Sequence, residues 1–173
     1  MMVLESNPHN NIFFARLLVF LKEILDICND LNISPILVGS LAVFAYTKDP
    51  TIDVNDIDLA IPEVEYERIT KILEEKNIEH KIRNYHVLQV KRGDLKVELD
   101  SVEYWLKDIP LDCETLQIDE YKIQILSLSS LTKFYAQGME DRLKKSADPK
   151  ERLKYEALKA KYELLTSLQK MRS

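Results

Sequence analysis

The sequence is poor in the residues that interrupt or cross-link a chain. Its 173 residues include 3 Gly, 6 Pro and 2 Cys. No Gly/Ser-rich or Pro-rich stretch separates one part from another, which argues against two domains joined by a linker. Cys28 and Cys113 form no Cys-x-x-Cys pair, so neither a zinc site nor a disulfide framework is supported. We expect one continuous domain in a reducing, cytoplasmic compartment.

Positive charge is also in short supply. The net charge of -5 disfavours a protein that binds a nucleic-acid backbone over its whole surface. A basic stretch over residues 142–154 is a candidate contact for RNA, although acids interspersed in it are more typical of a solvated helix face. The apolar run over residues 12–27 contains charged residues, so it predicts neither a signal peptide nor a membrane span.

Apolar residues make up 46% of the chain, enough to bury a sizeable core. Their spacing predicts an α/β fold, since helical and strand-like periods alternate along the chain. We expect helices over residues 11–31, 41–46, 63–76 and, in two pieces, 129–171. We expect strands over residues 36–38, 56–61, 87–92 and 95–100, with one or two short edge strands in 115–126.

Two aspartates stand out in the second predicted strand. Asp56 and Asp58 are two residues apart, so on a strand both carboxylates leave the same face, with their Cα atoms roughly 6.5 Å apart. Side chains at that separation can converge on one or two divalent ions. Oxygen ligands favour Mg²⁺ or Mn²⁺ over zinc. The chain is rich in acids, however, so this pattern alone also fits a solvated strand face.

A buried strand that ends in Gly39-Ser40 strengthens the metal hypothesis. Glycine allows a phosphate to approach the backbone, and Ser40 offers a hydroxyl beside the first amides of a short helix. Without the downstream acids, a plain helix cap at Ser40 would be the better interpretation. A third acid would complete a two-metal site, and the strand over residues 95–100 supplies Glu98, with Asp100 as the substitute.

Residues 36–46, Ile-Leu-Val-Gly-Ser-Leu-Ala-Val-Phe-Ala-Tyr, followed by Asn-Asp-Ile-Asp-Leu-Ala-Ile at 55–61, resemble the signature of the DNA polymerase beta-like nucleotidyltransferase superfamily. Within it the chain is similar to the small stand-alone members, including the abortive-infection toxin type. The resemblance covers roughly residues 33–101.

The resemblance implies a nucleotidyltransferase-like mixed sheet flanked by helices. It implies a core over residues 1–126, with a C-terminal helical segment over 127–173 packed on the same core. It also implies two magnesium ions held by three carboxylates, and an acceptor that attacks the α-phosphate with loss of pyrophosphate.

Carried onto this sequence, the resemblance assigns roles to individual residues. Gly39 and Ser40 would hold the triphosphate, Asp56 and Asp58 would bind metal, and Glu98 would be the third acid. A lysine in the helix after the core faces the nucleotide in such enzymes, which suggests Lys133; an exposed helical lysine is the alternative. Related toxins often carry a basic residue and a Thr shortly before the first Asp, where this chain has Ile52 and Val54.

The leading hypothesis is therefore a Mg²⁺-dependent enzyme that moves a nucleoside monophosphate from a nucleoside triphosphate such as ATP to an acceptor. The acceptor is RNA, a protein or a small molecule, and the sequence separates neither these nor the donor base. A catalytically silent nucleotide-binding or antitoxin-like module with a partner protein is a second hypothesis, and a phosphotransferase is a third. Apolar faces on the first and last helices fit either a homodimer or a single core.

Overall fold

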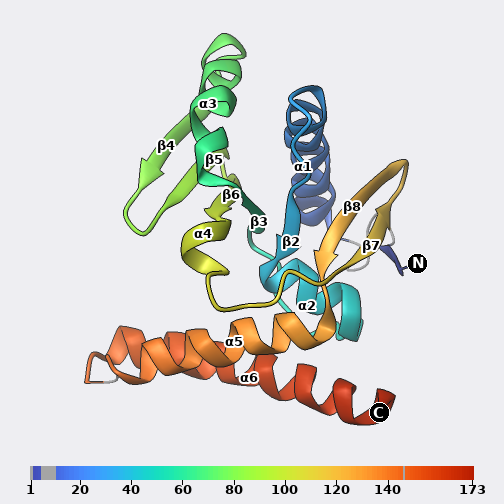
Figure 1. The fold of residues 1–173 in the computed structure, drawn as a ribbon, viewed down its shortest axis with the longest axis vertical. Coiled ribbons are helices and arrows are strands. Elements are labelled where there is room, and N and C mark those ends of the chain that lie inside the picture. Colours follow the sequence, from blue (N-terminus) through green and yellow to red (C-terminus); the bar gives the residue numbers. More distant parts are fainter. Residues whose placement is uncertain (1, 5–10, 146) are drawn as a thin grey trace.

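The computed structural model describes residues 2–4, 11–145 and 147–173. Eight strands within these ranges form one mixed sheet in the order β1-β7-β8-β2-β3-β6-β5-β4, and helices cover it (Figure 1). The α/β fold predicted from the sequence is confirmed. The strands are β1 (Met2–Leu4), β2 (Ile36–Val38), β3 (Ile57–Ile61), β4 (Glu79–Arg83), β5 (Val87–Arg92), β6 (Leu95–Ser101), β7 (Cys113–Ile118) and β8 (Tyr121–Leu126).

The helices lie where apolar residues recur at helical spacing. They are α1 (Ile12–Asp30), α2 (Gly39–Thr47), α3 (Tyr66–Glu75), α4 (Val102–Trp105), α5 (Leu128–Leu143) and α6 (Pro149–Arg172), with a 3-10 turn over Glu63–Glu65. None of the helices in the described ranges is both long enough and apolar enough to cross a bilayer.

The centre of the sheet is apolar on both faces. All three residues of β2 are buried, and so are four of the five residues of β3. β2 pairs antiparallel with β3, which in turn pairs parallel with β6. Strands enclosed on both sides gain from continuous apolar runs, which explains why Ile36-Leu37-Val38 carries no polar residue. These three strands form a rigid frame for the side chains at their ends.

Helices α1 and α3 lie on one side of this frame, and α2 with α5 and α6 on the other (Figure 1). The α1 helix begins after Asn11, whose side chain accepts a hydrogen bond from the Phe13 amide at 2.8 Å. Its apolar stripe, including Phe14, Leu17, Leu21 and Ile24, is buried. That stripe is why residues 12–30 form a helix that packs on the sheet.

The two C-terminal helices pack on each other and on α2. The two helices lie close at Gly138 of α5, where a Cβ would make an ordinary contact with Leu158 Cδ1 at 3.5 Å. The α6 helix begins with Pro149 after Asp148, whose side chain accepts a hydrogen bond from the Lys150 amide at 2.9 Å. Leu165 of α6 is fully buried.

The structure differs from the sequence predictions at β8, at β4 and at the start of α2. β8 is an interior strand beside β2, because β7 and β1 continue the sheet beyond it. β4 was not anticipated, since most of its residues are exposed and no apolar alternation marks it. Ser40 does not cap α2: the helix already includes Gly39, and no side chain caps its first turn.

Candidate functional site

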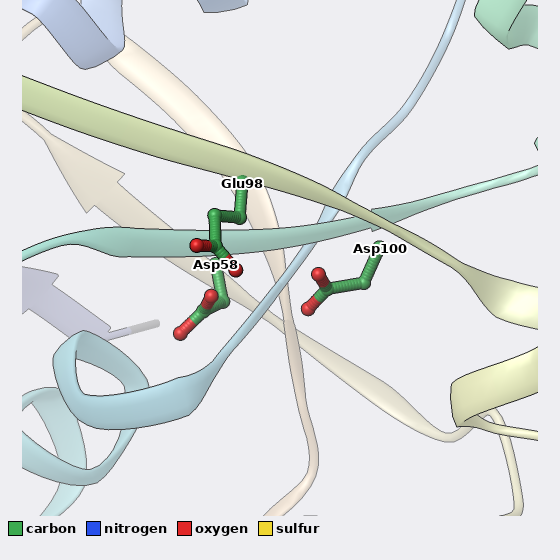
Figure 2. A group of neighbouring side chains, drawn as sticks. All are labelled: Asp58, Glu98 and Asp100. Atoms are coloured by element: carbon green, nitrogen blue, oxygen red, sulfur yellow. The ribbon is translucent and has the colours of Figure 1, made fainter. Parts of the chain in front are cut away.

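Strand register brings three carboxylates together at one end of the central strands. Asp58 on β3 lies directly beside Glu98 on the parallel strand β6, and Asp100 follows two residues later on the same face. Figure 2 shows the three side chains converging, and one ligand oxygen from each lies within 4.8 Å of the others. The pairing of β3 with β6 therefore builds an acidic cluster, defined here as Asp58, Glu98 and Asp100.

Gly39 lies against Asp58 at the end of β2. Its φ of +74° is a left-handed conformation that side chains disfavour, and a Cβ on it would lie 2.3 Å from Asp58 Oδ2. Val38, the residue before it, is paired with Asp58 across the antiparallel ladder. The backbone at Gly39 thus contacts the Asp58 carboxylate, and no residue with a side chain fits there.

Ser40 is half-buried in the first turn of α2, next to Gly39. Its hydroxyl is hydrogen-bonded to the hydroxyl of Tyr135, a buried residue of α5. Burial raises the pKa of Tyr135, and the nearby charge of Asp58 raises it further. Tyr135 therefore remains neutral and connects α5 to the turn that covers the acids.

Asp56 and Glu98 share one lysine. Lys96 Nζ lies 3.3 Å from Asp56 Oδ2 and 3.3 Å from Glu98 Oε1. Glu98 also accepts a hydrogen bond from Gln89 Nε2 at 3.4 Å, and Arg83 Nη1 lies 4.0 Å away. Burial lowers the pKa of Lys96, but the charges of Asp56 and Glu98 outweigh it and the net pKa is raised. These two acids are neutralised by the protein itself.

Asp58 and Asp100 have no such neutralisation. Within the described residues, neither of them forms an ion pair, and Asp100 is only 8% exposed. Burial raises the pKa of Asp100, and the charges of Asp58, Glu98 and Asp56 raise it further. Burial and the charges of Asp56 and Glu98 likewise raise the pKa of Asp58, while Lys96 and Lys161 act in the opposite direction. Two acids are thus held where ionisation is unfavourable unless a cation is added.

Lys161 of α6 is a residue that sequence reasoning missed. It is half-buried, and the charges of Asp58, Asp56 and Asp53 act on it. Burial lowers the pKa of Lys161 despite these acids. Lys133, the lysine suggested by the sequence, is exposed on α5. It lies two residues from the buried Tyr135, so it points from nearly the opposite face of that helix.

The donor set fits a hard divalent cation. All three side chains of the acidic cluster offer carboxylate oxygens, which Mg²⁺ and Mn²⁺ prefer, and no His or Cys belongs to it. The uncompensated charge of Asp58 and Asp100 is the property that a bound cation would relieve. The free amides of the first turn of α2 begin at the adjacent Gly39, where an anionic group such as phosphate is favoured.

Solved structures share this fold over most of the chain. The solution structure of antibiotic-resistance factor ANT(2'')-Ia matches with a TM-score of 0.60 and 16% identity, covering 93% of this chain and 94% of that one. A nucleotidyltransferase-like structure from Thermotoga maritima matches with a TM-score of 0.59 and 21% identity, covering 84% and 98%. The lincosamide antibiotic adenylyltransferase LnuA, solved with lincomycin, matches with a TM-score of 0.50 and 14% identity, covering 80% and 94%.

Comparison with curated proteins finds no match. The sequence itself matches the family model of the aminoglycoside-2''-adenylyltransferases over residues 20–151, which include the Gly39 turn and all four acids. The chain therefore belongs to the aminoglycoside-2''-adenylyltransferase family and is an enzyme of the nucleotidyltransferase superfamily.

Proposed function

We propose that this enzyme transfers a nucleoside monophosphate, AMP in the first instance, from a magnesium-bound nucleoside triphosphate to a hydroxyl of a small molecule. The observation that carries the proposal is a pair of acids with no ion-pair partner among the described residues: half-buried Asp58, which lies against Gly39, and buried Asp100. A triphosphate with its cation supplies the positive charge that these acids lack and the anion that the first turn of α2 favours.

The metal ligands in this proposal are Asp56, Asp58 and an acid of β6. Sequence reasoning put Glu98 first and Asp100 second as that acid. The geometry favours Asp100. Glu98 already has three partners, Lys96, Gln89 and Arg83, whereas Asp56 shares only Lys96 and, among the described residues, no cation pairs with Asp100. Glu98 then serves to hold Lys96 in place between the strands.

Magnesium, when bound, would withdraw charge from the triphosphate and ease departure of pyrophosphate. The protein's own residues would bind and orient the triphosphate and accept a proton. Gly39 lets the triphosphate approach the backbone, and Ser40 and the amides of α2 bind its oxygens. Asp100 is also the acid that would accept the proton of the attacking hydroxyl, directly or through one water.

Lys161 replaces Lys133 in the proposed nucleotide site. The charges of Asp56 and Asp58, which would bind the metal, act on its half-buried amine. Once a cation offsets those charges, the amine is placed to contact a phosphate oxygen. Because Lys161 comes from α6, we also propose that residues 127–173 complete the site as part of one domain with residues 1–126.

The acceptor in this proposal is a small-molecule antibiotic, in preference to RNA or a protein. ANT(2'')-Ia was crystallised with adenylyl-2''-tobramycin, and LnuA was solved with lincomycin. The same fold and family membership support an acceptor of this size here.

Pyrophosphate release tests the proposal. Wild-type enzyme with Mg²⁺ and ATP, GTP, CTP or UTP would be assayed with tobramycin or lincomycin present and with neither. We expect acceptor-dependent pyrophosphate release that disappears in Asp56→Asn/Asp58→Asn. Release of ADP in place of pyrophosphate would show a phosphotransferase, and nucleotide binding without any release would show a silent binding module.

A further inference from the structure

A group of aromatic side chains lies immediately beyond Asp100. We define the aromatic patch as Tyr85 and His86, from the turn between β4 and β5, together with Tyr104 and Trp105 of α4. The His86 ring stacks on Tyr104 with centroids 4.4 Å apart, and Tyr104 meets Trp105 edge-on at 5.3 Å. Tyr85 and Tyr104 are 59% and 47% exposed, unusually high for large aromatic side chains.

The patch is connected directly to the acidic cluster. Val87 of β5 is paired with Asp100 of β6, and the amide of Ser101 donates a hydrogen bond to the His86 carbonyl at 3.1 Å. A molecule resting on the aromatic patch therefore lies beside the end of β6 that carries Asp100. The acceptor of the proposed reaction must present its hydroxyl at this place.

The turn that presents the patch is strained and firmly held. Tyr85 and His86 both have positive φ, at 68° and 61°, a conformation that large side chains rarely adopt. Trp105 Nε1 donates to the Tyr85 carbonyl at 2.8 Å, and the Tyr66 hydroxyl donates to the His86 carbonyl at 2.8 Å. Strain that surrounding residues maintain in this way points to a function for the side chains it positions.

Two carboxylates and one amine border the patch. Glu63 accepts a hydrogen bond from His86 Nδ1 at 2.5 Å, and Glu103 accepts one from the Glu63 amide at 3.0 Å and another from the Ser101 hydroxyl at 3.1 Å. Lys145, which follows α5, places its amine 5.9 Å from the centre of the Tyr85 ring. Hydrogen bonds therefore fix the positions of the two carboxylates, and Lys145 places a cation beside the Tyr85 ring.

We propose that the aromatic patch is the acceptor subsite, and that it takes a hydroxylated small molecule with an apolar ring face. This proposal rests on the function proposed above and narrows it. The Tyr104 and Trp105 rings would pack against the apolar face of the acceptor, and the exposed Tyr85 ring would offer one position for a cation in competition with Lys145.

Trp105 provides a direct readout because it is the single tryptophan of the chain. Its fluorescence would be followed while the full-length enzyme, with Mg²⁺ and α,β-methylene-ATP, is titrated with lincomycin, which carries one amine and an alkyl-substituted ring, or with tobramycin, a polycation. We expect a Trp105 response with a Kd about tenfold lower for lincomycin than for tobramycin.

Variants locate the binding site. Tyr104→Ala is expected to raise the Kd of lincomycin about tenfold, with Tyr104→Phe restoring it, while the affinity for α,β-methylene-ATP stays unchanged. Ile82→Ala is the matched control, an exposed apolar side chain on the same hairpin but outside the patch. Tighter or equal binding of tobramycin, no response to either compound, or indifference to Tyr104→Ala would overturn the acceptor subsite. Failure of the nucleotide analogue to bind wild-type enzyme would instead overturn the proposed nucleotidyl transfer, on which the acceptor subsite depends.

Discussion

Two groups of carboxylates in this molecule occupy opposite environments. On the surface, Glu23 is held by Arg92, Asp119 by Lys22 at 2.5 Å, and Glu151 by Arg142 at 2.5 Å. In the acidic cluster, by contrast, half-buried Asp58 lies against Gly39 and Asp100 is buried, and neither has a paired cation among the described residues.

The pKa directions follow this difference. The Arg92 hydrogen bond lowers the pKa of Glu23, and the Arg142 hydrogen bond lowers that of Glu151, whereas burial raises those of Asp58 and Asp100. A surface acid with a partner contributes a little to stability. A buried acid without one destabilises the fold, so its presence indicates a site that an external cation completes.

Gly39→Ala is expected to have the largest effect on activity, because the added methyl group would occupy the space of the Asp58 carboxylate. A Cβ 2.3 Å from Asp58 Oδ2 must displace that carboxylate, and misplacement of a ligand by about 1 Å costs roughly 100-fold in rate. We expect kcat/KM for nucleotidyl transfer to fall by at least that factor.

Gly93→Ala is the matched control. Gly93 also has a positive φ, +60°, but nothing lies within 4 Å of its added Cβ. Both variants carry the backbone cost of a left-handed residue, about 1–2 kcal/mol in urea unfolding. Equal activity of the two variants would contradict the role given to Gly39.

The choice between the two acids of β6 gives the next largest effect. Asp100→Asn is expected to lower kcat by about 100-fold or more, because it removes the proposed metal ligand and base. Glu98→Gln is expected to lower it only about tenfold, through loss of its contact with Lys96. Steady-state kinetics of both variants would check this order, and the reverse order would restore Glu98 as the third acid.

The pH dependence of stability sharpens the comparison further. The raised pKa values of Asp58 and Asp100 mean that, above about pH 4, these two carboxyl groups bind more protons in the folded chain than in the unfolded chain. Without metal, the free energy of unfolding should therefore fall as pH rises through this window toward the raised pKa values. Urea unfolding in EDTA across the pH range measures it.

Removing the buried acid Asp100 supplies the control for that pH dependence. Asp100→Asn should be more stable than wild type at neutral pH by about 1 kcal/mol, with a flatter profile. A profile unchanged by Asp100→Asn would show that its burial has no thermodynamic cost.

A smaller effect is expected at the hydrogen bond between Ser40 and Tyr135. Tyr135→Phe leaves the buried ring in place but removes the hydroxyl, so unfolding free energy should fall by about 1 kcal/mol. The KM for the nucleotide should rise a few-fold, since Ser40 loses the contact that orients it. An unchanged KM would separate Ser40 from nucleotide binding.

The smallest effect is expected in the surface group. Glu23→Gln breaks the pair with Arg92 and should lower the free energy of unfolding by no more than about 1 kcal/mol, with activity unchanged. High salt should reduce the difference between variant and wild type. A loss of activity in Glu23→Gln would mean that the two groups of acids are not independent.

The strand patterns made most of the site predictable. Alternation around Asp56 and Asp58 and the apolar run ending at Gly39 were enough to place a turn beside an acid-bearing strand. The hairpin around Gly93 was also predictable, because its two strands alternate on either side of a turn residue. Strand β4 could not be predicted in this way, since an exposed edge leaves little apolar pattern.

Residues from elements distant in sequence determine which acid of β6 is unpaired and which lysine lies near the acids. Glu98 and Asp100 face the same way, and only the positions of Lys96, Gln89 and Arg83 distinguish a neutralised acid from an unpaired one. Similarly, Lys161 approaches the acids because α6 packs against α2, a relation that no local pattern encodes. Lys133 followed from resemblance, and the packing of α5 leaves it exposed.

The most direct test of the account is isothermal titration of ATP into wild-type enzyme and into Asp56→Asn/Asp58→Asn, each with Mg²⁺ and with EDTA. The account predicts binding to the wild type that requires Mg²⁺ and is lost in the double variant. Binding that ignores both the metal and the two substitutions would contradict it, because Asp56 and Asp58 would then have no part in holding the nucleotide.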